Sequence, residues 1–231
     1  MQKTLKLLLC KTMNYHKLII LCLSFFICTQ FAGCNNARGK TAKKETIEEA
    51  AEETLDKSME FLRAKADTAE AYCREHKMNT EFCFLIDMSI HSGKYRLFAW
   101  DFKNREVLFS GLCCHGAGGE STREKPEFSN VSGSNCTSLG KYKLGIRSYS
   151  NWGINIHYKM HGQEETNSNA YKRIVVFHSY TPVPDYEIYP HHLPLGWSLG
   201  CPVVSDNIMR QADKLLKGVD TKEPVLMWIY D

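Results

Sequence analysis

The chain has 231 residues, enough for one mid-sized domain with attached segments. Its formal net charge of +3 arises at the N-terminus, where Lys3, Lys6, Lys11 and Lys17 occur without an acidic residue. Without these four of the 29 basic residues, the sequence after residue 33 holds 25 basic and 26 acidic residues, so a basic face for nucleic acid is excluded and no nucleic-acid partner is predicted.

Residues 1–33 are predicted to be a lipoprotein signal peptide. The apolar run at 18–28 has the length of a signal-peptide core and is short for a membrane span. It leads into Phe31-Ala32-Gly33-Cys34, which resembles a bacterial lipobox with Phe31 in place of the usual leucine. Cys34 is then the lipidated first residue, and we expect a membrane-anchored periplasmic lipoprotein of the cell envelope. Translation from Met13 would leave a signal peptide of ordinary length. The alternative is a single N-terminal anchor helix, and either arrangement places the body outside the cytoplasm.

A tether and a helix are predicted next. Residues 34–45 are small, polar and basic, as in a tether, and an amphipathic helix is expected over 46–78, with Thr46 and Glu49 as a capping box. Its apolar residues recur at spacings of three and four and form one stripe: Ile47, Ala51, Leu55, Met59, Leu62, Ala66, Ala69 and Cys73. The opposite face is charged, so the helix is expected to pack against the domain or to space it from the membrane. A coiled-coil partner is the weaker alternative.

Beyond Asn79 the pattern changes to that of β-strands. Strands are predicted over 82–90, 95–101, 106–113, 141–146, 153–160, 172–178 and 225–230, because these runs are rich in β-forming residues and several are bounded by turn signals. The glycine-rich segment 115–119 lacks the lysine and the following helix of a phosphate-binding loop, so no nucleotide site is predicted there.

Two further segments complete the predicted domain. Residues 180–197 are irregular and rich in proline, and they lead directly into the segment around Cys201, which is typical of a lid beside a chemical site. Ser205 or Asp206 caps a short helix that runs to Leu216 and ends at Gly218. The predicted fold class is mostly β, a sandwich or partly closed barrel, with an N-terminal amphipathic helix and one short C-terminal helix.

The segment with the clearest chemical signal is 197–204, which contains Gly200, Cys201 and Pro202. The glycine permits an unusual φ or a close approach, and the proline fixes φ and removes a backbone donor. A thiol in such a turn can stand exposed while neighbouring N–H groups point the same way, which a cysteine nucleophile and its oxyanion hole require. His178 ends an apolar strand upstream and supplies a base. The alternative is a buried, unreactive cysteine.

Four ordered blocks carry a family resemblance: FSN at 128–130 with SLGKY at 138–142, NSNA at 167–170 leading to Arg173, IVVFH at 174–178, and GWSLGCP at 196–202. They resemble the murein L,D-transpeptidase catalytic domain family, the YkuD-like proteins, and most closely the YkuD_2 branch. The resemblance implies a YkuD-like catalytic domain over 80–231 that acts on peptidoglycan stem peptides. In that family a cysteine attacks the carbonyl of the third stem residue and expels the terminal D-alanine. The acyl group then passes to an amine of another stem, or to water.

The resemblance also implies catalytic roles. Cys201 is the nucleophile, His178 takes and returns the proton, and Ser179 positions His178 through its carbonyl. A thiolate is the attacking species, so His178 is expected to lower the pKa of the thiol or to form an ion pair with it. The N–H groups of Gly200 and Cys201 are candidate oxyanion donors, and Ser198 either holds the turn or meets the substrate.

Substrate-binding candidates follow from the same blocks. Arg173 suits a bidentate contact with a carboxylate, or a structural salt bridge. Asn167 either binds substrate or caps or turns the backbone, and the backbone role is equally open for Asn169. Trp197 stands where the family leads us to expect arginine or a small residue, so it changes the pocket wall. The remaining histidines of this region are interpreted as surface or loop residues: His157, His161, His191 and His192.

Other functions were weighed against this one. A metal site built from 113–115 with His191 and His192 is disfavoured, because adjacent strand residues face opposite ways, and no metal or cofactor is predicted. Six cysteines follow Cys34, and if Cys201 is a free thiol five of them remain, so at least one more is unpaired. A papain-like amidase would place its cysteine before its histidine, and a sortase would show a different motif. The alternatives left open are an L,D-carboxypeptidase of the same fold and a non-catalytic, lipid-anchored peptidoglycan-binding protein.

Overall fold

The structure is a computed structural model that describes residues 37–231, with side chains described from residue 56 onward. The predicted signal peptide and Cys34 lie outside the described residues. Among the described residues, Thr54–Asp231 form one compact unit, which is separate from the preceding part of the chain. No helix within residues 37–231 is long and apolar enough to cross a membrane.

Helix α2 (Ala37–Glu75) begins earlier than predicted. It passes through Thr46, so the expected capping box does not start it, and residues 37–45 of the expected tether are helical. This segment holds alanine, arginine and lysine, which have high helix propensity and need no cap to continue a helix. The predicted apolar stripe is confirmed in the part whose side chains are described, where these residues are buried: Leu62, Ala66, Ala69 and Cys73.

The fold is mostly β, as predicted. One sheet contains β1 (Phe82–Asp87), β2 (Leu97–Asp101), β3 (Glu106–Gly111), β4 (Gly140–Tyr149), β5 (Ile156–Gly162), β6 (Val176–Ser179), β7 (Val203–Val204) and β8 (Leu226–Tyr230). Their order is β3-β2-β1-β8-β4-β5-β6-β7, and the pairs β1–β8 and β6–β7 are parallel.

The two ends of this strand order meet. Cys114, just beyond β3, forms a bridge with Val203 of β7, and its N–H donates to the Val203 carbonyl at 2.8 Å. Farther along, the N–H of Ala117 donates to the carbonyl of Ser198 at 3.0 Å. The sheet is therefore nearly closed, which confirms the expected YkuD-like, partly closed barrel.

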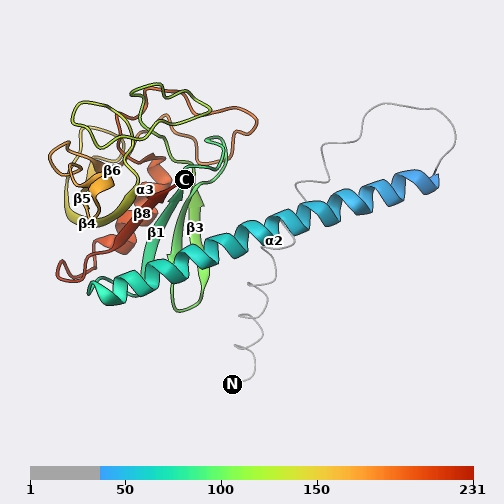
Figure 1. The fold of residues 1–231 in the computed structure, drawn as a ribbon, viewed down its shortest axis with the longest axis horizontal. Coiled ribbons are helices and arrows are strands. Elements are labelled where there is room, and N and C mark those ends of the chain that lie inside the picture. Colours follow the sequence, from blue (N-terminus) through green and yellow to red (C-terminus); the bar gives the residue numbers. More distant parts are fainter. Residues whose placement is uncertain (1–36) are drawn as a thin grey trace, which may run out of the picture. The chain divides into compact units, whose positions relative to one another are not determined.

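Both faces of β1 are buried, because successive side chains point to opposite sides. Phe84 and Ile86 join the main core with α3 (Asp206–Leu216). Cys83 and Leu85 join a second cluster formed with α2. The helix expected outside the catalytic domain, over 46–78, thus packs on the sheet of that domain through its C-terminal half (Figure 1). Helix α3 matches its prediction, since the Oγ of Ser205 accepts from the N–H of Ile208 at 3.3 Å.

Strand β6 begins at Val176, four residues later than predicted. The preceding residues form a turn, in which the N–H of Val175 donates to the carbonyl of Ala170 at 2.9 Å and that of Ile174 to Tyr171 at 3.1 Å. This is the hydrogen-bond pattern of a Schellman motif. Ile174 occupies its left-handed position with φ +58°, where glycine is usual. Strand β7 was not predicted, because two residues are too few for a periodic signal.

The segment 180–197, predicted to be a lid, is docked on the barrel. Val183 and Leu193 are buried in a third cluster with Leu112, Cys114 and Val203. The backbone N–H groups of two of its residues, 188 and 189, donate to the carbonyl of Gly93 at 2.8 and 3.1 Å. The loop is therefore a fixed wall in this structure.

The six cysteines among the described residues are all free thiols. Cys113 lies in the main core and Cys114 in the third cluster, so the two adjacent side chains face opposite sides of the strand. Within residues 37–231, no group of three or more histidine, cysteine or acidic side chains is placed to hold a metal ion.

Candidate active site

A cavity of about 550 Å³ opens beside β6 and the segment around Cys201. Strand β6 presents its residues alternately to this cavity and to the core. Val175, next to the strand, and Phe177 are core residues, while Val176 and His178 line the cavity. The cavity therefore takes its chemistry from one face of a buried strand, and Cys201 lies on its wall.

The strand register brings the predicted nucleophile and base together. In the parallel pair β6–β7, His178 lies opposite Val203. Cys201, two residues before Val203, thus lies alongside Val176, two residues before His178. The N–H of Val176 donates to the Cys201 Sγ at 3.4 Å, which fixes this placement. The thiol, in the turn just before β7, and the imidazole, on β6, lie at the wall of one cavity.

The tautomer of His178 follows from its partner. Its Nδ1 lies 3.0 Å from the carbonyl oxygen of Ser179, and a carbonyl can only accept, so we assign the proton to Nδ1. In the neutral ring, Nε2 then carries the free lone pair. Ser179 is fully buried, and its Oγ accepts from the N–H of Ile154 at 3.1 Å. The expected positioning carbonyl is thereby held rigidly.

Electrostatics differ from the expected ion pair. Burial raises the pKa of the Cys201 thiol, although the Val176 N–H and the Arg173 guanidinium act against this. Burial also lowers the pKa of His178, opposed by the hydrogen bond to Ser179, while the neighbouring His157 lowers it further. Both shifts favour the neutral forms, a thiol and an imidazole, from which the proton moves to His178 when the thiol attacks.

The turn before Cys201 is stabilised by Ser198. Its Oγ donates to the carbonyl of Cys201 at 2.6 Å and accepts from the N–H of Gly200 at 3.0 Å. Of the two predicted roles of Ser198, the structure therefore favours holding the turn. The Gly200 N–H is already bonded and is not free for an oxyanion at rest. The Cys201 N–H has no acceptor within residues 37–231, so it is the available donor of the two.

Gly200 must be glycine. Its φ is +110°, a conformation that L side chains rarely adopt. A Cβ at this position would lie 2.7 Å from the carbonyl oxygen of Cys136 and 3.2 Å from a terminal nitrogen of Arg173. The thiol turn is thus pressed directly against the segment that contains Cys136.

Arg173 holds that segment in place. Its terminal nitrogens donate to the carbonyls of Ser129 and Cys136, each at 2.7 Å, and to the hydroxyls of Ser138 and Ser134. No carboxylate pairs with it within the described residues, so the expected structural salt bridge is absent there. All four of these bonds go to the segment behind the turn. The guanidinium therefore serves as a scaffold and is not presented for a bidentate contact with substrate.

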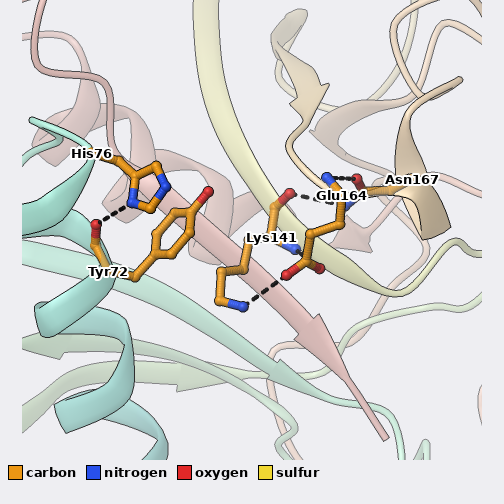
Figure 2. A network of polar contacts seen from close by, with 5 residues as sticks. All are labelled: Tyr72, His76, Lys141, Glu164 and Asn167. Atoms are coloured by element: carbon orange, nitrogen blue, oxygen red, sulfur yellow. Dashed lines mark hydrogen bonds and ion pairs between the residues drawn. The ribbon is translucent and has the colours of Figure 1, made fainter.

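Asn167 is fully buried. Its Nδ2 donates to the carbonyl of Lys141 at 2.8 Å, and its Oδ1 accepts from the N–H of Glu164 at 3.0 Å. Glu164 in turn pairs with the Nζ of Lys141 at 2.8 Å (Figure 2). The amide of Asn167 therefore fixes the backbone, the second of its two predicted roles, and is not exposed to substrate. The short 3₁₀ helix at this position, Glu165–Asn167, was not predicted.

The first two sequence blocks thus meet in one polar scaffold. Arg173 joins its own block to Ser129 and Ser138, and Asn167 joins it to Lys141. Asn169 donates twice to Asn130, from its backbone N–H to the Oδ1 at 3.1 Å and from its Nδ2 to the backbone carbonyl at 3.0 Å. Gly200 abuts this scaffold, so most of the motif residues position the thiol turn.

Several cavity residues were not predicted. His157 was interpreted as an ordinary loop or surface residue, yet it lines the cavity and lies opposite His178 in the β5–β6 register. Aromatic and aliphatic side chains complete the wall: Tyr149, Trp152, Tyr180, Ile174 and Leu199. Trp197 is a wall residue, as predicted, and packs edge-on to Tyr180 at 5.8 Å between ring centroids. A correct strand register would have revealed His157, but the sequence carries no signal for that register.

Comparison with known proteins gives one clear assignment. A family model described as the L,D-transpeptidase catalytic domain, YkuD_2, matches residues 53–225, which include the second half of α2. No curated protein matches the chain significantly. Among solved structures, an L,D-transpeptidase from Xylanimonas cellulosilytica is 14% identical with a TM-score of 0.35, over 64% of this chain and 60% of that one. The helical cell shape determining protein Pgp2 from Campylobacter jejuni is 10% identical with a TM-score of 0.42, over 70% of this chain and 55% of that one. The chain thus spans less than two thirds of either structure.

Proposed function

Since the chain belongs to the YkuD_2 family of L,D-transpeptidase catalytic domains, we propose that it is a cell-envelope cysteine L,D-transpeptidase acting on peptidoglycan stem peptides through a Cys201 acyl-enzyme. One observation carries the proposal. The Cys201 thiol and the His178 ring line one cavity, and the Nδ1 of His178 is bonded to the buried Ser179 carbonyl, which leaves Nε2 to accept a proton.

The first half-reaction forms a thioester. The Cys201 sulfur attacks the carbonyl carbon that links the third stem residue to the terminal D-alanine, and the thiol proton passes to Nε2 of His178. The carbon–nitrogen bond then breaks, and His178 returns that proton to the departing amine of D-alanine. Because the resting pair is neutral, His178 acts as a general base during attack.

The second half-reaction transfers the acyl group. An amine of another stem attacks the thioester carbonyl and loses a proton to Nε2 of His178. The carbon–sulfur bond breaks, and the proton returns to the sulfur of Cys201. The Cys201 N–H stabilises the oxyanion in both steps. With water as the acceptor, the same steps give an L,D-carboxypeptidase.

The N-terminal segment suggests where the enzyme works. The lipobox-like sequence ending at Cys34 supports a lipid-anchored protein of the periplasm. Labelling of cells with an alkyne-tagged fatty acid tests this part, because the parent should carry label and Cys34→Ala should not. Label on both proteins would contradict the lipid anchor.

The test of the chemistry is intact-mass measurement of the purified protein incubated with disaccharide-tetrapeptides, alongside Cys201→Ala. We expect a transient adduct of the donor lacking D-alanine on the parent only, and 3-3 cross-linked dimers in the product mixture. His178→Ala should bind substrate but form the adduct far more slowly. Tripeptide product without dimers would make the protein an L,D-carboxypeptidase. Neither adduct nor product, with Cys201 reduced, would overturn the acyl-enzyme proposal and leave the non-catalytic binding protein.

A further inference from the structure

The mouth of the catalytic cavity is lined by exposed apolar side chains. Tyr149, Trp152, Ile174 and Leu199 are 72%, 57%, 75% and 64% exposed, and all four line the cavity. We call this group the rim. Exposed apolar side chains gathered beside a pocket indicate a binding function, because their contact with water is unfavourable and a bound ligand would remove it.

Trp152 is exposed and yet held in place. Its ring packs edge-on to Tyr180 at 5.7 Å, and Tyr180 packs edge-on to Trp197 at 5.8 Å. Its loop is closed by hydrogen bonds between Ser150 and Asn155 and between Asn155 and Trp152, each of 3.1 Å. An exposed side chain on a rigid loop loses little entropy when a ligand binds, so Trp152 is preorganised as a contact surface.

The same loop is fastened to the catalytic strand. The N–H of Ile154 donates to the Oγ of Ser179, whose carbonyl positions His178. A Cβ on Gly153 would lie 2.0 Å from that Oγ, so the loop backbone lies directly on the strand. The position of Trp152 is therefore fixed relative to the reacting thiol and its base.

The cavity wall contains no aspartate, glutamate, lysine or arginine among the residues the structure describes. Its polar groups at the rim are the hydroxyl of Tyr149, the indole N–H of Trp152 and the amide of Asn151. A neutral, aromatic surface with few hydrogen-bonding groups suits a ligand ring that has an apolar face and hydroxyl or amide substituents. A membrane or a second protein on the rim would close the mouth through which donor and acceptor must enter, so the occupant has to be part of the substrate.

We propose that Trp152, with Tyr149 at the adjoining end of β4, binds the N-acetylated sugar that carries the donor stem, so that the enzyme prefers stems still attached to glycan. This inference rests on the proposed function. The three stem residues between sugar and scissile bond span about 10 Å when extended, so a sugar on the donor stem lies away from the thiol. Trp152 and Cys201 line the same cavity, which places the aromatic surface beside the path of the stem.

The experiment compares disaccharide-tetrapeptide with the same tetrapeptide lacking the disaccharide. For the parent, kcat/KM should be about tenfold higher for the disaccharide form, an amount typical of one aromatic contact. Trp152→Ala should reduce that ratio toward one, mainly through KM, and Trp152→Tyr should restore much of it. Tyr186→Ala is the matched control, because Tyr186 is an exposed aromatic residue, 68% accessible, that does not line the cavity. Its ratio should equal that of the parent.

Binding to Cys201→Ala, measured by calorimetry with both ligands, separates this inference from the proposed function. One outcome is that the disaccharide form binds more tightly, that this preference depends on Trp152, and that the parent shows no turnover. It would support the sugar-binding role of Trp152, here called the sugar platform, and overturn the catalytic proposal. Turnover with equal kcat/KM for both substrates overturns the platform alone. A preference that Trp152→Ala leaves intact also overturns it, and equal loss on both substrates would assign Trp152 to the stem peptide. If the disaccharide form is neither bound nor turned over, both the sugar site and the catalytic proposal are overturned.

Discussion

Ile174 gives the sharpest test, because it is a β-branched residue in a backbone conformation that such residues rarely adopt. It occupies the left-handed position of a Schellman motif with φ +58°, where a β-branched residue is an outlier. Its side chain is 75% exposed at the rim of the cavity, so burial does not compensate for this conformation. We therefore expect Ile174 to be present for function at the expense of stability.

The magnitude follows from two substitutions. Ile174→Ala removes the side chain but keeps a residue with a Cβ in the left-handed region, which costs about 1–2 kcal/mol. Ile174→Gly removes the side chain and that cost, although the greater freedom of the unfolded glycine chain takes back about 0.5–1 kcal/mol. The glycine variant should thus be the more stable of the two by about 1 kcal/mol. For a domain of this size, the difference in melting temperature is about 2–4 °C.

The assay is thermal and urea unfolding of the parent and both variants, with kcat/KM measured on the disaccharide-tetrapeptide. Both variants should lose activity to a similar extent, since both lack the side chain at the rim. Ile174→Gly should nevertheless be more stable than Ile174→Ala. Equal melting temperatures for the two variants would refute the strain argument. Unchanged activity in both would refute the functional role of the side chain.

Three other predictions concern the site and its scaffold. The pKa of the Cys201 thiol is raised and that of His178 is lowered, so the rate of alkylation of Cys201 by iodoacetamide should keep rising with pH above about 8.5, the ordinary thiol pKa. A plateau of that rate near about pH 6–7 would indicate an ion pair instead. Gly200→Ala should destabilise the fold by more than about 2 kcal/mol and abolish activity, whereas Gly218→Ala, where a Cβ meets no atom within 4 Å, should unfold like the parent. Asn167→Ala leaves the N–H of Glu164 without a partner and removes one of the two hydrogen bonds to the Lys141 carbonyl, so it should cost about 1–3 kcal/mol in urea unfolding, unlike the exposed Asn104→Ala. Equal losses in the two variants would show that the buried network is not stabilising.

Features that depend on neighbours in the chain could be predicted from the sequence. The stripe of α2 follows from residues spaced three and four apart, and the start of α3 follows from Ser205, whose hydroxyl caps a residue three positions on. The Gly200-Cys201 turn and the strand ending at His178 are local patterns too, and this explains why the fold class and both cavity-lining residues could be predicted.

The tertiary structure alone decided how these parts meet. The pairing of β6 with β7, and the closure of the sheet by Cys114 and Val203, join segments far apart in sequence through backbone hydrogen bonds that any side chain permits. The use of Arg173 as a scaffold depends on carbonyls 37 and 44 residues away, and no residue pattern encodes which carbonyl a guanidinium will reach. Burial likewise raises the pKa of Cys201 and lowers that of His178, which favours the neutral forms over the expected ion pair. The desolvation of a thiol and an imidazole depends on everything packed around them, and only the folded chain specifies that packing.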